Sequence, residues 1–317
     1  MIANILLLLL GLILLVGGAN LLTDGAASVA KRFRLSNLVI GLTVVAFSVS
    51  APELVVSLTA SLKESADIAV GNILGSNIVN ILAVVGVAAL IAPLSISNNT
   101  LRIGIPLVIL SSLALFFMAN DRLFDHSMEN ILSRTEGFVL LVFFVLFLFY
   151  VFGLSRGDDA PTPIRQFALG LSALMIVGGS IALFFGGQLF VDHAATLAAR
   201  LGVSESVIAL SVMAIGTSLP ELITTIVALV RKQSGMAIGN IVGSNILNVL
   251  LVLGVSASIS PMRIQSITLI DYGIFIFAAL LLYVFGLFFG DKTIQRLEGG
   301  ILVTLYVCYI SFLLFTA

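Results

Sequence analysis

The chain contains two copies of one sequence pattern, separated by 168 residues without a gap (221 − 53 = 168). In each copy a glutamate follows a proline, as Glu53 follows Pro52 and Glu221 follows Pro220. With the same offset, residues 69–86 and 237–254 are identical at twelve of eighteen positions. The pattern is therefore an internal repeat, and the fold must place its two copies in related positions.

Around both copies the chain is a series of long apolar runs. Of its 317 residues, 60% are hydrophobic and 10% are charged, whereas soluble proteins carry about 25% charged residues. Each run approaches the roughly 20 residues that a helix needs to cross a bilayer. We therefore expect an all-α polytopic membrane protein with about ten transmembrane helices, near residues 2–22, 37–61, 68–93, 101–119, 134–154, 164–190, 205–230, 237–260, 266–288 and 297–316.

The repeat divides these spans into two halves of five. We predict a first repeat at residues 1–154, a cytoplasmic linker at 155–163 and a second repeat at 164–317. Because five is an odd number, the second half enters the membrane from the opposite side, and the halves are inverted repeats. In transporters of this design the binding site lies near the middle of the membrane, on helices that Gly or Pro interrupts.

Lysine and arginine are distributed unevenly between the connections. Those after odd-numbered spans carry Lys31, Arg32, Arg34, Arg102, Arg156, Arg165, Arg231, Lys232, Lys292 and Arg296, and those after even-numbered spans carry Lys63, Arg122, Arg134, Arg200 and Arg263. An excess of Lys and Arg marks cytoplasmic loops. The sequence therefore predicts that both termini lie outside the cell.

Polar residues recur at helical spacing within the repeated segments. Each proline removes a backbone donor, which frees nearby carbonyls to act as ligands. Residues three or four apart share one face of a helix, and four such faces are polar: Ser50, Glu53 and Ser57; Ser218, Glu221 and Thr225; Asn72, Ser76 and Asn80; and Asn240, Ser244 and Asn248. We expect these faces to converge on one polar seam. Glycines beside them allow the helices to approach closely.

The seam offers oxygen ligands alone, since Cys, His and Met are absent from these positions. Such a set suits hard cations and is poor for Zn²⁺ or Cu²⁺. Mg²⁺ prefers to keep its water, so Ca²⁺ and Na⁺ fit best. The two carboxylates carry a charge of −2, which one Ca²⁺ or two Na⁺ would neutralise. A site that holds either ion in turn meets the requirement for exchange.

The paired motifs GNILGSNIVN and GNIVGSNILN, which follow SAPE and SLPE, resemble the two alpha-repeats of the Ca²⁺/cation antiporter superfamily, most closely its prokaryotic sodium/calcium exchangers. The resemblance implies a cell-membrane antiporter that exchanges three Na⁺ for one Ca²⁺ by alternating access, in which spans 1 and 6 slide across the other eight. It implies central Ca²⁺ ligands at Glu53 and Glu221. It also implies hydroxyl, carbonyl or amide oxygens from Ser50, Ser76, Asn80, Thr217, Ser218, Ser244 and Asn248, and backbone carbonyls from Ala46 and Ala214 at outer Na⁺ sites.

Two positions depart from the family pattern. The usual Gly-Thr-Ser before the acidic motif is present at Gly216 to Ser218, but Val49 replaces the threonine in the first copy. Val49 can offer a carbonyl but no hydroxyl, which puts one Na⁺ site in question. Asn248 stands where some relatives carry aspartate. The site therefore has one acid fewer to hold an extra cation, which argues against dependence of transport on K⁺.

Three functions are compatible with the residues. The first is Na⁺-driven Ca²⁺ antiport, and the second couples Ca²⁺ to H⁺ or another cation, because buried carboxylates can take protons. The third, an intramembrane hydrolase with paired acids, leaves the Ser/Asn-rich repeat unexplained, so we do not expect an enzyme. We expect no cofactor, nucleic acid or obligate protein partner, and contact with Ca²⁺, Na⁺ and the lipid bilayer. For Asp24 and Asp192, at predicted helix ends near basic residues, we expect structural ion pairs.

Overall fold

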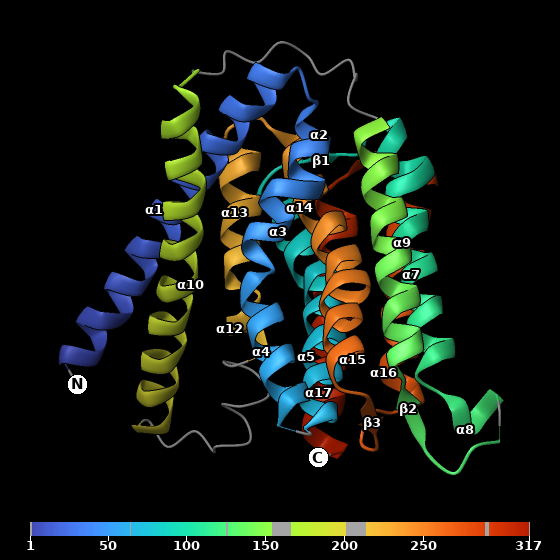
Figure 1. Cartoon of the computed structure of the whole chain (residues 1–317). Helices are drawn as coiled ribbons and strands as arrows, with labels where there is room; N and C mark the ends of the chain where they lie inside the picture. Colours follow the sequence, from blue (N-terminus) through green and yellow to red (C-terminus); the bar gives the residue numbers. More distant parts are fainter. Residues whose placement is uncertain are drawn as a thin grey trace.

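The structure, a computed structural model, describes residues 2–63, 65–124, 126–153, 166–200, 214–288 and 292–316. Eight helices in these ranges are long and apolar enough to cross a membrane, and a bent pair makes a ninth span. The first half contains α1 (Ile2–Phe33), α2 (Asn37–Ile40), η1 (Gly41–Val45), α3 (Ala46–Val49), α4 (Ala51–Leu62), α5 (Ala66–Ile78), η2 (Val79–Val84), α6 (Val85–Ile91), β1 (Leu94–Ser95), η3 (Thr100–Gly104), α7 (Ile105–Met118), α8 (Asp121–Phe124), β2 (Asn130–Leu132) and α9 (Arg134–Gly153). The prediction of an all-α polytopic membrane protein is confirmed (Figure 1).

The second half repeats this order. It contains α10 (Leu169–Arg200), α12 (Ala214–Thr217), α13 (Leu219–Val230), α14 (Ser234–Leu247), η5 (Asn248–Leu253), α15 (Gly254–Ile259), β3 (Met262–Ile264), α16 (Leu269–Phe288), β4 (Thr293–Ile294) and α17 (Arg296–Thr316). The predicted span at 205–230 is described from residue 214 onward, as α12 and α13. The predicted linker at 155–163 lies outside the described residues, so the proposed repeat boundaries stay a prediction.

Helices α1 and α10 are longer than the sequence predicts. Each has 32 residues, or about 48 Å at 1.5 Å per residue, against a hydrocarbon core about 30 Å thick. The prediction that the first and sixth spans end near residues 22 and 190 is therefore wrong. The apolar runs do end there, but the helices continue because they pack against each other along their length. Asp24 and Asp192 consequently lie inside helices and not at their ends.

Small residues form the contact between α1 and α10, which stand together on the left of Figure 1. Gly18 packs against Gly179, and a Cβ added to Gly18 would lie 2.8 Å from the Gly179 carbonyl oxygen. Gly11 packs against Gly186 in the same way. The two numbers in each contact add to 197, as antiparallel helices require. The repeat relates Gly11 to Gly179 and Gly18 to Gly186 (offset 168), so the contact follows the internal symmetry.

Two short antiparallel sheets join the halves of the chain, which the sequence did not predict. β1 pairs with β4, and β2 pairs with β3. Each sheet therefore takes one strand from each half. β1 lies near the top of Figure 1, whereas β2 and β3 lie at the bottom. Because β3 follows β1 at the repeat offset (94 + 168 = 262), this arrangement is what an inverted repeat produces.

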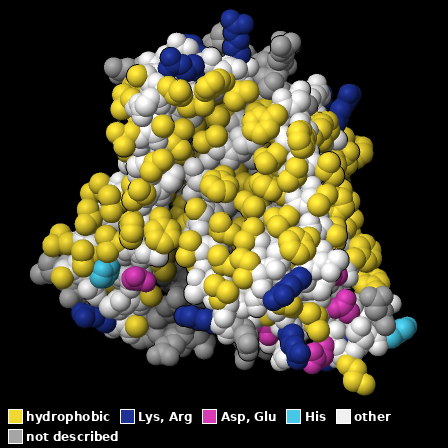
Figure 2. Space-filling model, in the orientation of Figure 1, with side chains coloured by type: hydrophobic (Ala, Val, Ile, Leu, Met, Phe, Trp, Pro, Cys, Tyr) yellow, Lys and Arg dark blue, Asp and Glu magenta, His cyan; other side chains and the backbone are white. Residues whose placement is uncertain are grey.

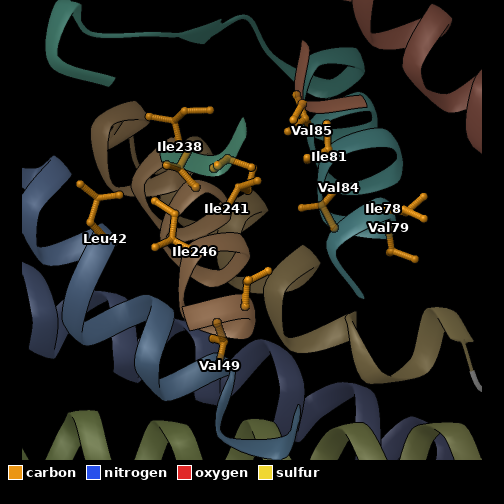
Figure 3. Packing of buried hydrophobic residues seen from close by; sticks show 14 of the residues in the cluster. Leu42, Val49, Ile78, Val79, Ile81, Val84, Val85, Ile238, Ile241 and Ile246 are labelled. Atoms are coloured by element: carbon orange, nitrogen blue, oxygen red, sulfur yellow. The ribbon is translucent and has the colours of Figure 1, made fainter. Parts of the chain in front are cut away.

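The core is built around two equivalent helical rods, α5–η2–α6 and α14–η5–α15. Apolar side chains from α14, among them Ile241 and Ile246, lie between the segment that contains Leu42 and Val49 and the rod α5–η2–α6 (Figure 3). Apolar side chains also cover the middle of the outer surface, with charged groups at its two ends (Figure 2). Both chain ends lie in the lower part of Figure 1.

Candidate functional site

Both glutamates lie immediately after a break in a buried helix. α3 and α4 meet at a bend of 48°, where Ser50 leaves helical geometry (φ −82°, ψ 1°). Ser218 has nearly the same backbone angles (φ −93°, ψ 8°) between α12 and α13. Glu53 and Glu221 occupy the first turns of the new helices, where the positive end of the helix dipole favours a carboxylate. The predicted interruption at the prolines is thus present in both repeats.

The two carboxylates are buried inside the protein, with exposures of 1% for Glu53 and 0% for Glu221. Ser76 Oγ donates to Glu53 Oε1 at 3.4 Å. Glu53 Oε2 and both carboxylate oxygens of Glu221 find no hydrogen-bond donor in the described ranges. An unpaired buried carboxylate is strongly unfavourable. A positively charged ligand between the helices would relieve this cost.

Other buried side-chain oxygens of the predicted polar faces also lack hydrogen-bond partners. Within the described part of the chain, no hydrogen bond reaches the side-chain oxygens of Ser50, Ser218, Ser244, Asn80 and Asn248. Each such group left unsatisfied costs about 1–3 kcal/mol. Their residues lie on the breaks and on the two central rods, as the helical spacing predicts. The arrangement offers carboxylate, hydroxyl and amide oxygens together, which are the ligands that hard cations prefer.

Asn72 and Asn240 form hydrogen bonds that join the predicted polar faces in pairs. Asn72 Nδ2 donates to Ser57 Oγ at 3.2 Å, and Asn240 Nδ2 donates to Thr225 Oγ1 at 3.1 Å. These equivalent bonds fasten α5 to α4 and α14 to α13. One residue of each predicted polar face therefore takes part in holding the helices together.

The remaining predicted ligands divide between backbone and side chain. Thr217 is partly buried at the end of α12, and Ala214 begins that helix. The Ala46 carbonyl already accepts the Ser50 N–H at 2.9 Å, which leaves one lone pair for another partner. Val49 is fully buried and its side chain packs in the apolar cluster of Figure 3. That its carbonyl serves as a ligand stays a prediction.

Asn77 is a polar residue at the centre that the spacing argument missed. It lies one position after Ser76, off the face that residues 72, 76 and 80 share. Its Nδ2 donates to the Asn245 carbonyl at 3.4 Å, and its Oδ1 accepts from Asn248 Nδ2 at 3.0 Å. The signal was present, because Asn77 and Asn245 are equivalent positions in the two Ser-Asn pairs of the repeat.

The two ends of the molecule differ in the structure that lies between the helix breaks and the surface. A cavity of about 160 Å³ lies between α4, α10 and α12, lined by residues that include Pro52, Gln188, Asp192, Thr217 and Pro220. It adjoins both breaks. At the opposite end, Arg231 forms an ion pair with Asp24. The predicted structural pairing is confirmed for Asp24, whereas Asp192 makes no ion pair with any described residue.

Comparisons with known proteins agree with this architecture. The family model described as "Sodium/calcium exchanger protein" matches residues 3–153 and 171–315. The inner membrane protein YrbG of Escherichia coli (strain K12) is 36% identical, over 94% of this chain and 92% of that protein. The sodium/calcium exchanger MaX1 of Methanosarcina acetivorans is 29% identical, over 98% and 99%. A solved structure of the sodium-calcium exchanger NCX_Mj has a TM-score of 0.81 with 30% identity, over 98% of each chain.

Proposed function

We propose a function for this chain from its family, since it belongs to the sodium/calcium exchanger family. It is a secondary antiporter that exchanges Na⁺ for Ca²⁺ across the cell membrane by alternating access. Membership in a transporter family argues against the third function considered from the sequence, an intramembrane hydrolase. The observation that carries the proposal is the pair of buried carboxylates, one from each repeat, among oxygens that lack donors in the described residues.

The chemistry of this site favours ions over neutral substrates. Glu53 and Glu221 together carry −2, which one Ca²⁺ balances. Na⁺ has a similar radius and lower charge, so more than one ion is needed to balance the same carboxylates. Competition between Ca²⁺ and Na⁺ for the same oxygens makes their occupancy mutually exclusive, and this exclusion couples the two fluxes. Ser50, Ser76, Asn80, Thr217, Ser218, Ser244 and Asn248 would complete the coordination, with carbonyls from Ala46, Val49 and Ala214.

The contact between α1 and α10 supports a route for alternating access. Close contacts at glycines on both helices hold them together as a pair. They contact α13 and α3 beside the breaks. A movement of this pair would expose the site to one side at a time. The cavity beside α10 supports access from the end that holds both termini, which we propose lies outside the cell, as the distribution of Lys and Arg predicts.

Proton coupling is the competing function, and flux measurements distinguish it. The purified protein is reconstituted into vesicles loaded with Na⁺ and diluted into Na⁺-free buffer that contains ⁴⁵Ca²⁺. We expect Ca²⁺ uptake that depends on the outward Na⁺ gradient, and no uptake when K⁺ replaces Na⁺ inside. Uptake driven equally well by a pH gradient in the absence of Na⁺ would establish H⁺ coupling. The absence of uptake under both gradients would reject Ca²⁺ antiport.

A further inference from the structure

Asn77 joins the two repeats through both ends of one buried amide. It is fully buried on α5. Its Nδ2 donates to the backbone oxygen of Asn245 at 3.4 Å, and its Oδ1 accepts from Asn248 Nδ2 at 3.0 Å. Both partners belong to the second repeat. Asn77 thus bridges the first repeat to the residue of the second repeat that we propose as an ion ligand.

The first of these bonds fixes the orientation of the rest. A backbone carbonyl can only accept, so the amide nitrogen of Asn77 must face Asn245 and its oxygen must face Asn248. That oxygen can in turn only accept, so Asn248 presents its amide nitrogen to Asn77. The Asn248 oxygen is consequently turned away from Asn77. This oxygen is buried and has no donor among the described residues.

The equivalent residues of the other repeat are arranged differently. Asn245, the counterpart of Asn77, donates to the Ile241 carbonyl of its own helix at 2.8 Å. Asn80, the counterpart of Asn248, is buried, and neither atom of its amide has a partner in the described ranges. Among the described residues, a protein hydrogen bond therefore orients the Asn248 amide but not the Asn80 amide. The difference cannot come from the motif, which reads Ser-Asn-Ile-x-Asn in both copies.

We infer that Asn77 is a positioning residue for ion binding, which holds the Asn248 amide with its oxygen available to the transported cation. The inference rests on the proposed function, because it takes Asn248 as a ligand. An asparagine amide has a donor end and an acceptor end of nearly equal shape. Without Asn77, the amide can rotate and present its N–H groups to the cation, which they repel. Asn77 removes that alternative before the ion arrives.

The test compares Asn77→Leu with Asn245→Leu, a matched control from the same buried layer. Asn245→Leu removes an amide that bonds only within α14 and keeps the carbonyl that Asn77 uses. We expect Asn77→Leu to raise the half-saturating Ca²⁺ concentration about tenfold, which corresponds to about 1.4 kcal/mol, with a smaller change in maximal rate. Asn245→Leu should change the same concentration less than twofold. Asn77→Ser replaces Asn77→Leu if the leucine variant is not monodisperse.

A double-mutant cycle separates positioning from general stability. If Asn77 acts through Asn248, Asn77→Leu has no further effect on ion affinity in an Asn248→Ala background. Additive losses, or equal effects of Asn77→Leu and Asn245→Leu, would overturn the inference. Direct binding of ⁴⁵Ca²⁺ and ²²Na⁺ to the purified proteins is measured in parallel. If the wild-type protein binds Na⁺ but not Ca²⁺, the proposed function is contradicted. The role of Asn77 is then decided by comparing the Na⁺ affinities of Asn77→Leu and Asn245→Leu. Binding of neither ion overturns both.

Discussion

Arg231, directly after α13, forms an ion pair with Asp24 inside α1, and its guanidinium also donates to Asn20 Oδ1 at 2.5 Å. The repeat gives each of these residues a counterpart: Lys63, Asp192 and Gln188 at the offset of 168. Lys63 and Asp192 form no ion pair within the described part of the chain, and Gln188 and Asp192 line the cavity beside α10. The end of the molecule near Arg231 is thus held by an ion pair, whereas Gln188 and Asp192 at the opposite end line a cavity.

Breaking the ion pair between Arg231 and Asp24 should favour the state that is open at the Arg231 end over the state that is open at the cavity. Because both side chains are about one-third exposed, we expect Arg231→Gln to destabilise the present state by no more than about 1 kcal/mol, or about fivefold. The measurement is the rate at which a membrane-impermeant thiol reagent labels Gln188→Cys, in a Cys308→Ser background that has no other cysteine. We expect slower labelling. Lys63→Gln is the control, and a rate equal to that of the control would contradict the role of Arg231.

Replacing either central glutamate should abolish transport without unfolding the protein. Glu53→Gln and Glu221→Gln each leave a divalent ion with a single counter-charge at a buried site, where the loss of one partner costs about 3–5 kcal/mol. We therefore expect Na⁺-driven ⁴⁵Ca²⁺ uptake to fall at least about 100-fold. The matched control is Glu298→Gln, which alters another buried first-turn glutamate, one that accepts from the Gln295 N–H at 3.0 Å. Full exchange by either central variant would refute the site assignment.

Neighbouring glycines of α1 should respond oppositely to the same substitution. A Cβ at Gly18 would lie 2.8 Å from the Gly179 oxygen and 2.9 Å from the Leu183 nitrogen, whereas a Cβ at Gly17 meets nothing within 4 Å. We expect Gly18→Ala to cost about 1–3 kcal/mol by forcing α1 from α10. Gly17→Ala should be neutral or stabilising, because alanine favours helix. Thermal unfolding followed by size-exclusion chromatography measures the difference, and equal midpoints would show that the helices do not need this close contact.

Exchange of three Na⁺ for one Ca²⁺ should depend on voltage. Each cycle then moves one net positive charge, worth about 2.3 kcal/mol per 100 mV. We expect an inside-negative potential to accelerate Ca²⁺ exit coupled to Na⁺ entry. Potentials of both signs are imposed on proteoliposomes with K⁺ and valinomycin. A flux that ignores the sign of the potential would indicate electroneutral exchange with two Na⁺, and the missing hydroxyl at Val49 would then be the first position to examine.

The repeated chemistry of the site could be predicted from the sequence because it depends on local spacing. Proline in the interior of a helix favours a break, and residues three or four apart share a face, so the breaks and the polar spacing around Glu53 and Glu221 could be predicted from the order of residues. Asn77 was not predicted, because its bonds depend on which helices meet across the repeat axis. That information is not contained in the periodicity of α5 alone.

Helix length was harder to predict for a related reason. Hydropathy marks where a chain leaves the bilayer, but α1 continues for about three more turns past Leu22. Asp24 is accommodated there by Arg231, a residue more than 200 positions away. The short sheets were equally hidden, because strands of two or three residues such as β1 and β2 carry no distinctive pattern. In each case a contact distant in sequence determines the local structure.

The pairing of β1 with β4 and of β2 with β3 sets a limit on when the protein can finish folding during its synthesis. A ribosome that has made the first half has released β1 and β2, but the strands that complete their sheets lie at residues 262–264 and 293–294. Glu53 is likewise made long before Glu221. Until the second half is made, β1 and β2 therefore lack their partner strands, and Glu53 lacks its counterpart Glu221. The sheet of β1 and β4 can therefore form only after residue 294 has been made.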